Sequence, residues 1–201
     1  MNKKCLQVFA KAPVKGQVKT RLISDLGEDG AYEVYRQLLE KSLTLATQSN
    51  YRTELWCHPS QQHAYFQQAA IDHPLTLNDQ YGNDLGERMR FAMQNGLQVN
   101  DAVVLIGCDC PVLTEKYIAQ TYDALRFVDV VLGPAEDGGF VLIGCKKTHY
   151  LMFKNVIWGK SSVLDSTLDS LQQCGLSHRL LPTLWDVDIL SDYTRWQSDL
   201  N

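Results

Sequence analysis

Residues 102–106 read AVVLI, and GCDCP follows them directly at residues 107–111. The first five residues form a continuous apolar run rich in β-branched side chains, which is typical of a strand buried on both faces. Further short apolar runs stand at residues 6–10, 52–57, 75–77, 128–132, 140–145 and 179–184. The recurrence predicts a sheet in which residues 102–106 form the clearest buried strand.

Segments of helical character separate these runs, at residues 31–46, 61–70, 86–97, 114–127, 162–174 and 191–200. Thr114 is expected to be an N-cap, Ser162 with Asp165 a capping box, and Gly175 the end of the helix that begins there. Strands that alternate with helices predict an α/β fold with a largely parallel sheet. The turn at residues 137–139 adds a mixed or antiparallel element.

Length and composition predict one globular domain over residues 1–201, since 45% of the residues are hydrophobic and 21% are charged. No run approaches the roughly 18 apolar residues of a membrane span, and the run at 6–10 is too short for a signal peptide. We therefore expect a cytoplasmic protein. The net charge of −4 argues against nucleic acid as a partner.

Cysteine, histidine and tryptophan residues give no sign of a site of their own. The six cysteines include no CxxC pair, and the five histidines lack zinc-site spacing. We interpret the cysteines as reduced and structural. Trp158, Trp185 and Trp196 are expected to be core or interface aromatics.

Positive charge is concentrated at the start of the chain. Residues 1–24 hold six cations and no carboxylate, whereas the other 177 residues hold 13 cations and 23 acids. Four of the six cations (Lys11, Lys15, Lys19 and Arg21) stand in the loop KAPVKGQVKTR directly after the first expected strand. This loop lacks the P-loop pattern, but its cations could wrap a diphosphate or triphosphate. From the residues alone, a solvated basic loop is the alternative.

Acidic residues follow the later expected strands. Ligands of α/β sheets bind at the carboxyl ends of the strands, where Asp109 and Asp137 are expected. Asp109 suits Mg²⁺ or Mn²⁺ bound against substrate phosphates, or is an ordinary turn carboxylate. Asp137 precedes two glycines, so it either contacts a metal or a substrate hydroxyl or simply forms a tight turn. Asp186 and Asp188 either complete a metal site or cap the last helix.

Five stretches in order carry a family resemblance: FAKAPVKGQVKTRL (9–22), QYGNDLGERM (80–89), VVLIGCDCPVLT (103–114), GPAEDGGFVLIG (133–144) and DVDILSDY (186–193). Together they resemble a bacterial family assigned as glycosyltransferases within the nucleotide-diphospho-sugar transferase superfamily. Its relatives include the molybdenum-cofactor nucleotidyltransferases and phospholactate guanylyltransferase. The resemblance implies the glycosyltransferase A fold, a three-layer α/β/α sandwich that binds nucleotide at the carboxyl edge of its sheet.

The resemblance also implies roles for individual residues. Lys11, Lys19 and Arg21 match the basic signature loop that would hold nucleotide phosphates, with Lys15 in the same loop. Gly86 and Arg88 match the segment that would close over the nucleotide. Asp109 and Asp188 match metal-binding carboxylates. Asp137 matches a family signature, with either acceptor contact or metal support as its role.

These residues predict a transferase that uses a nucleotide-activated donor together with Mg²⁺ or Mn²⁺. Lys19 and Arg21, with Asp137, are the expected catalytic residues, the two cations neutralising charge that develops during transfer. Glycosyl transfer from a sugar nucleotide to a small-molecule acceptor is the leading hypothesis. The alternatives are nucleotidyl transfer to a phosphorylated acceptor with release of pyrophosphate, and nucleotide binding without catalysis.

Overall fold

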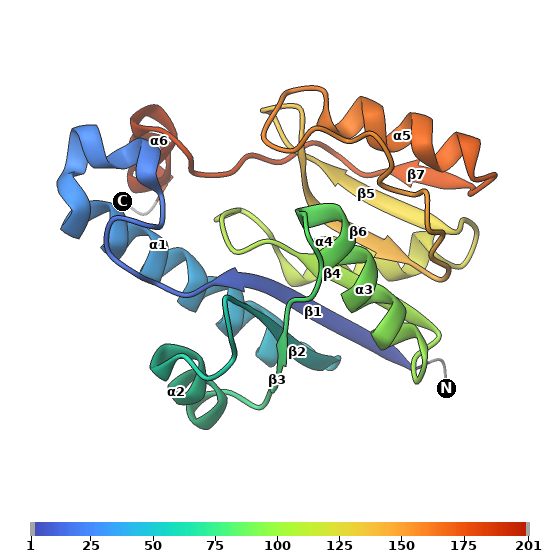
Figure 1. Cartoon of the computed structure of the whole chain (residues 1–201), viewed down its shortest axis with the longest axis horizontal. Coiled ribbons are helices and arrows are strands. Elements are labelled where there is room, and N and C mark those ends of the chain that lie inside the picture. Colours follow the sequence, from blue (N-terminus) through green and yellow to red (C-terminus); the bar gives the residue numbers. More distant parts are fainter. Residues whose placement is uncertain (1–2, 200–201) are drawn as a thin grey trace.

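A computed structural model describes residues 3–199 of the chain as a seven-stranded sheet flanked by helices (Figure 1). The strands are β1 Lys4–Lys11, β2 Arg52–His58, β3 Thr76–Asp79, β4 Ala102–Ile106, β5 Val130–Pro134, β6 Phe140–Cys145 and β7 His178–Leu180. The helices are the short 3-10 turn η1 Thr20–Leu22, then α1 Ile23–Gln48, α2 Ala64–Asp72, α3 Leu85–Leu97, α4 Glu115–Ala124, α5 Val163–Gln173 and α6 Leu190–Asp199.

The sheet is mostly parallel, with the strand order β3-β2-β1-β4-β6-β5-β7. Within residues 3–199, β6 alone runs antiparallel to its neighbours β4 and β5. The tight turn at residues 137–139 reverses the chain between β5 and β6, as the sequence predicted. In the parallel pairs, Val8 is level with Ile106 and Lys11 is level with His58, so β1, β2 and β4 end at the same edge of the sheet.

Alternating side chains of the strands bury both faces of the sheet. Leu6 and Val8 of β1 pack with α1, α2 and α4, while Cys5 and Phe9 pack with α3 and α5. This arrangement confirms the predicted three-layer α/β/α sandwich. Helix α6 lies apart from these layers, beside the beginning of α1, where Trp196 shares a buried cluster with Leu22 and Ala31 (Figure 1).

Several element boundaries differ from those predicted. Helix α1 begins at Ile23 and continues through a break at Gly27, whose φ is 72°. The last strand ends at Leu180 because Pro182 has no backbone N–H to donate to a neighbouring strand. Just past the strand, the N–H of Leu181 still donates to the carbonyl of Leu132 at 2.9 Å, and an isolated bridge then joins Leu184 to Ala135. The expected end of the closing helix at residue 200 lies outside the described residues.

The predicted helix caps were right in two cases and wrong in one. The Thr114 hydroxyl accepts a hydrogen bond from the backbone N–H of Tyr117, and Gly175 follows α5 with a positive φ of 66°. Ser162 makes no side-chain cap, so the capping-box prediction was wrong. Instead the N–H of Leu164, in the first turn of α5, donates to the carbonyl of Gly138 at 2.9 Å.

The sequence predicts reduced cysteines and no membrane-spanning segment. All six cysteines are free thiols, and five of them are buried. Among the residues described, no helix combines the length and the apolar character needed to cross a bilayer.

Candidate metal and nucleotide site

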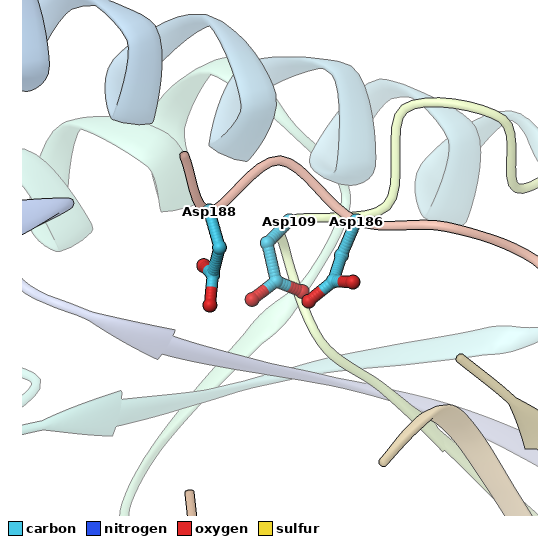
Figure 2. Close-up of side chains that lie close together, drawn as sticks. All are labelled: Asp109, Asp186 and Asp188. Atoms are coloured by element: carbon cyan, nitrogen blue, oxygen red, sulfur yellow. The ribbon is translucent and has the colours of Figure 1, made fainter. Parts of the chain in front are cut away.

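Three carboxylates meet at the carboxyl edge of the sheet. Asp109 follows β4, and Asp186 and Asp188 belong to the extended segment before α6. The N–H of Val187 donates to the carbonyl of Asp109 at 3.0 Å, which holds this segment beside the loop after β4. Because residues two apart in an extended chain point to the same side, Asp186 and Asp188 face Asp109 while Val187 is buried behind them. Figure 2 shows the three carboxylates pointing the same way, with Asp109 in the middle.

The cluster has the chemistry of a hard-cation site. One oxygen from each carboxylate lies within 4.8 Å of the other two. Burial and the neighbouring charges of Asp109, Asp137 and Asp188 raise the pKa of the Asp186 carboxyl to about 7. The carboxylates therefore repel one another at this point, which a bound cation would relieve. Mg²⁺ and Mn²⁺ prefer oxygen ligands, so the residues present fit either ion.

Lys19 and Arg21 reach the cluster from the loop after β1. The Lys19 ammonium lies 2.9 Å from Asp188 and 3.6 Å from Asp109, and the Arg21 guanidinium lies 3.0 Å from Asp188. Only 7% of the Lys19 side chain is exposed, against 60% for Arg21. Burial alone would lower the pKa of Lys19, but Asp109 and Asp188 outweigh it and raise the pKa above its usual value. Lys19 is therefore charged at neutral pH.

The backbone at Lys19 is in the left-handed region, with φ 44° and ψ 45°. A residue with a Cβ pays about 1–2 kcal/mol to adopt this conformation. Such strain is concentrated at functional sites, where the surrounding structure maintains it. The conformation turns the chain so that both Lys19 and Arg21 reach Asp188.

Helix capping does not explain Asp186 and Asp188. The carboxylate that accepts hydrogen bonds at the start of α6 belongs to Asp192, which takes the N–H groups of Asp188 and Ile189 at 3.0 Å each. The side chain of Asp188 instead binds Lys19 and Arg21. The capping alternative for Asp188 was therefore wrong.

Two adjoining cavities open beside the carboxylates. The larger has a volume of about 430 Å³, and its lining includes Asp109, Asp137 and Asp186. The smaller, of about 260 Å³, is lined by Lys19, Arg21 and Asp188 among others. Lys11 and Tyr35 line both, so the two spaces share a wall. The cavities are therefore large enough together for a ligand of nucleotide size.

Arg88 and Gly86 lie at the beginning of α3, on another wall. Arg88 lines the larger cavity, and its Nε donates a hydrogen bond to the carbonyl of Gly82 at 3.0 Å. The distance between Arg88 Nη1 and His58 Nδ1 is 3.2 Å. Burial, with Arg88 and Lys11 nearby, lowers the pKa of His58. Gly86 does not line the cavity; a Cβ there would lie 2.8 Å from the ring of Trp158. Gly86 thus allows Trp158 to pack close to α3.

Asp137 occupies the turn between β5 and β6. Its Oδ1 accepts the N–H of Gly139 at 2.8 Å, and its Oδ2 has no hydrogen-bond partner in residues 3–199. The turn hydrogen bonds between Ala135 and Gly138 or Gly139 fit the tight-turn interpretation. The carboxylate also lines the larger cavity, so the turn and functional interpretations are compatible.

The turn is fixed by a close approach at Gly138. Its φ is +87°, and a Cβ there would lie 2.1 Å from the backbone carbonyl oxygen of Ser161. We expect Gly138→Ala to destabilise the protein by about 1–3 kcal/mol more than Gly175→Ala. Both variants place a Cβ on a residue with positive φ, but only the Cβ at position 138 would also clash with neighbouring backbone. Gly175 is the matched control, since its φ is +66° and nothing lies within 4 Å of its Cβ position. Urea unfolding measures the difference, and equal losses for the two variants would contradict the contact.

Lys15, like Gly86, is a predicted site residue that lines neither cavity. It pairs with Asp29 of α1, and 59% of its side chain is exposed. Lys11 does line both cavities, and its ammonium donates to the carbonyl of Gln17 at 2.8 Å.

The lining of the larger cavity also includes residues that were not chosen from the sequence, among them Tyr35, His58, Trp158 and Lys160. Tyr35 accepts the N–H of Lys11 at 2.9 Å and donates to its carbonyl at 2.6 Å, which fixes the end of β1. Trp158 is half-buried in the cavity wall, so its interpretation as a core or interface aromatic was incomplete. Position at a strand end could have pointed to His58, but no local pattern marked the other three.

Comparison with solved structures places this arrangement in the nucleotide-diphospho-sugar transferase fold. A proposed nucleotide-diphospho-sugar transferase from Desulfovibrio desulfuricans G20 is 30% identical, with a TM-score of 0.90 over 100% of this chain and 89% of that one. A family model described as an uncharacterized protein conserved in bacteria (DUF2064) matches residues 41–160. The chain belongs to this DUF2064 family, and the predicted membership of the superfamily is confirmed.

More distant structures share the fold alone. A nucleotidyl transferase from Methanothermobacter thermautotroptrophicus is 12% identical, with a TM-score of 0.69 over 99% of this chain and 98% of that one. A 4-diphosphocytidyl-2C-methyl-D-erythritol synthase from Anaerococcus prevotii DSM 20548 is 13% identical, with a TM-score of 0.63 over 99% and 96%. No curated protein matches the sequence.

Proposed function

We propose that the protein is a divalent-metal-dependent glycosyltransferase that uses a sugar nucleotide as donor. The observation that carries the proposal is the meeting of three carboxylates with Lys19 and Arg21 beside a cavity at the carboxyl edge of the sheet. Ligands bind at this edge in open α/β sheets. The 30% identical structure from Desulfovibrio desulfuricans, a proposed transferase of the same kind, supports this choice.

The metal ligands in this proposal are Asp109, Asp186 and Asp188. When bound, Mg²⁺ or Mn²⁺ would stabilise negative charge on the donor phosphates. Lys19 lies within 3.6 Å of two of these carboxylates, so its ammonium can also reach phosphates bound beside them. Arg21 is more exposed and adds a planar donor group suited to phosphate oxygens.

The other wall of the cavity would hold the nucleotide. Arg88 is oriented by its hydrogen bond to Gly82, and Lys11 lies at the shared wall of the two cavities. The guanidinium of Arg88 and the ammonium of Lys11 would supply positive charge on this wall, beside the ring of His58. Such a distribution suits a ligand whose phosphates lie between a metal and fixed cations.

Asp137 is assigned to the acceptor. In the reaction, the acceptor hydroxyl oxygen forms a bond to the anomeric carbon of the donor sugar. The bond from that carbon to the phosphate oxygen breaks, and its electron pair leaves with the nucleoside diphosphate. The proton of the hydroxyl passes to the Asp137 carboxylate, whose Oδ2 has no partner among the described residues.

Nucleotidyl transfer is the second candidate. Its support is the fold shared with the nucleotidyl transferase and the diphosphocytidyl synthase over nearly the whole chain. In that reaction an acceptor phosphate oxygen attacks the α-phosphorus of a nucleoside triphosphate, and pyrophosphate leaves. The same cations, together with a metal held by the carboxylates, would then stabilise the negative charge of pyrophosphate.

A thermal-shift screen tests the proposal. With Mn²⁺ and a sugar nucleotide at a hundredfold excess over Kd, binding should raise Tm by about 5–10 °C. Neither Mn²⁺ nor the sugar nucleotide alone should give this shift. Product analysis then separates the reactions: release of nucleoside diphosphate supports glycosyl transfer, and release of pyrophosphate from a nucleoside triphosphate supports nucleotidyl transfer. Binding without turnover of any donor would leave a nucleotide-binding protein.

A further inference from the structure

The larger cavity has an apolar wall that the proposed transfer chemistry does not use. Its members are Leu85 and Met89 of α3, Phe140 of β6, and Trp158 in the segment before α5. Trp158 lies between Phe140 and helix α3. Its ring lies 6.3 Å from that of Phe140, and it packs against α3 at Gly86, the residue after Leu85. The wall is therefore continuous across three elements of the fold.

Part of this wall is open to solvent. Leu85 is 43% exposed, and both Phe140 and Trp158 are half-buried. Exposed apolar surface inside a cavity is typical of a binding site for an apolar group. Hydrogen-bonding groups are few, since Trp158 Nε1 is the one side-chain donor among these four residues. A sugar packed against these four side chains would find a single side-chain hydrogen-bond donor there, which favours an apolar group on this wall.

Polar groups stand at the edge of the wall. Asp137 immediately precedes the turn glycines before Phe140, and Lys160 follows Trp158 by two residues; both line the cavity. The hydrogen bond from Leu164 N–H to the Gly138 carbonyl and the contact of Gly138 with Ser161 join the two segments. These contacts hold the turn that carries Asp137 beside the segment that carries Trp158 and Lys160.

We infer that the acceptor is an alcohol with a flat apolar body, which packs on Leu85, Phe140 and Trp158 and presents its hydroxyl group to Asp137. This inference rests on the proposed function for the identity of the site as an acceptor site. The binding of such an alcohol can be measured without metal or donor, so the two proposals can fail separately.

The experiment titrates the protein with methylumbelliferone, a flat aryl alcohol, and follows the fluorescence anisotropy of the probe. Glucose is titrated in parallel by calorimetry. The wild-type protein should bind methylumbelliferone and not glucose. Trp158→Ala should weaken probe binding by about tenfold or more, because the largest apolar surface of the wall is lost. Trp158→Phe should retain most of the affinity.

Ile157→Ala is the matched control, since Ile157 is the neighbouring residue, is 66% exposed and does not line the cavity. It should bind the probe as the wild-type protein does. Leu85→Asn is the second test variant. It adds a polar group to the wall from a different element, so it carries the test if Trp158→Ala fails to fold, and it should also weaken binding. Folding of each variant is checked by thermal unfolding.

Binding of glucose but not of the aryl alcohol would overturn the inference, as would equal probe affinity in wild-type protein, Trp158→Ala and Leu85→Asn. If the probe binds as expected but no nucleotide binds with Mn²⁺, the apolar site stands and the proposed function fails. If nucleotide binds with Mn²⁺ and the probe does not bind, the proposed function stands and the apolar acceptor is wrong.

Discussion

Asp109→Asn is expected to abolish Mn²⁺-dependent binding of nucleotide and to lower turnover by about 10³-fold or more. Asp109 lies between the other two carboxylates, and its oxygen is within 4.8 Å of one oxygen from each (Figure 2). Asparagine keeps the shape of the side chain but removes its charge, so the site keeps its geometry and loses a strong ligand for a hard cation. Calorimetric titration with Mn²⁺, followed by nucleotide, measures the loss directly.

Asp169→Asn provides the matched control for Asp109→Asn. Asp169 is an exposed carboxylate of α5 outside the cluster, so its replacement makes the same change in net charge. We expect Asp169→Asn to bind Mn²⁺ and nucleotide as the wild-type protein does. Removal of the metal from wild-type protein with a chelator should reproduce the Asp109→Asn result. Unchanged Mn²⁺-dependent binding in Asp109→Asn would show that Asp109 is not a metal ligand.

The fold was largely predictable because its signals are local. The run at residues 102–106 became β4, and helical spacing over residues 31–46 marked most of α1. Errors occurred where tertiary contacts decide the local structure. At Ser162, the backbone of the Gly138 turn satisfies the start of α5, so no side-chain cap forms. The sequence near residue 162 does not indicate that the carbonyl of Gly138, 24 residues earlier, accepts a hydrogen bond from the start of this helix.

The site was predictable to the extent that its residues stand at strand ends. Asp109 follows a recognisable buried strand, and Lys19 follows the first one, so topology brings them to one edge. Asp186 was noted as part of an acidic pair, but only the fold shows that it and Asp188 face Asp109 from the same side of the chain. Lys15 illustrates the opposite case. Lys15 stands in the same basic loop as Lys19 and Arg21, yet its side chain pairs with Asp29 instead of the carboxylate cluster.

Lys19 is a buried counter-ion of two of the three carboxylates. Its ammonium lies 2.9 Å from Asp188 and 3.6 Å from Asp109, and the backbone holds a left-handed conformation there. A divalent cation bound by the same carboxylates would repel this ammonium by direct charge repulsion. If the proposed metal binds there, it would compete with Lys19 for the carboxylates until donor phosphates bind the lysine ammonium. Under the proposed function, Lys19 would therefore be a counter-ion in the free protein and a phosphate ligand in the protein with donor bound.

Replacing Lys19 with methionine separates these two roles. We expect Lys19→Met to bind Mn²⁺ alone about tenfold more tightly, because a competing charge is removed, and to lose about 10²–10³-fold in turnover, because the leaving phosphate loses a buried cation. The free variant should unfold at a lower temperature, since Asp188 keeps only Arg21 as a partner, and Mn²⁺ should restore its stability. Lys15→Met is the control: it removes a lysine of the same loop that pairs with Asp29, and both quantities should stay near the wild-type values. Weaker or unchanged Mn²⁺ binding in Lys19→Met would refute the competition, whatever happens to turnover.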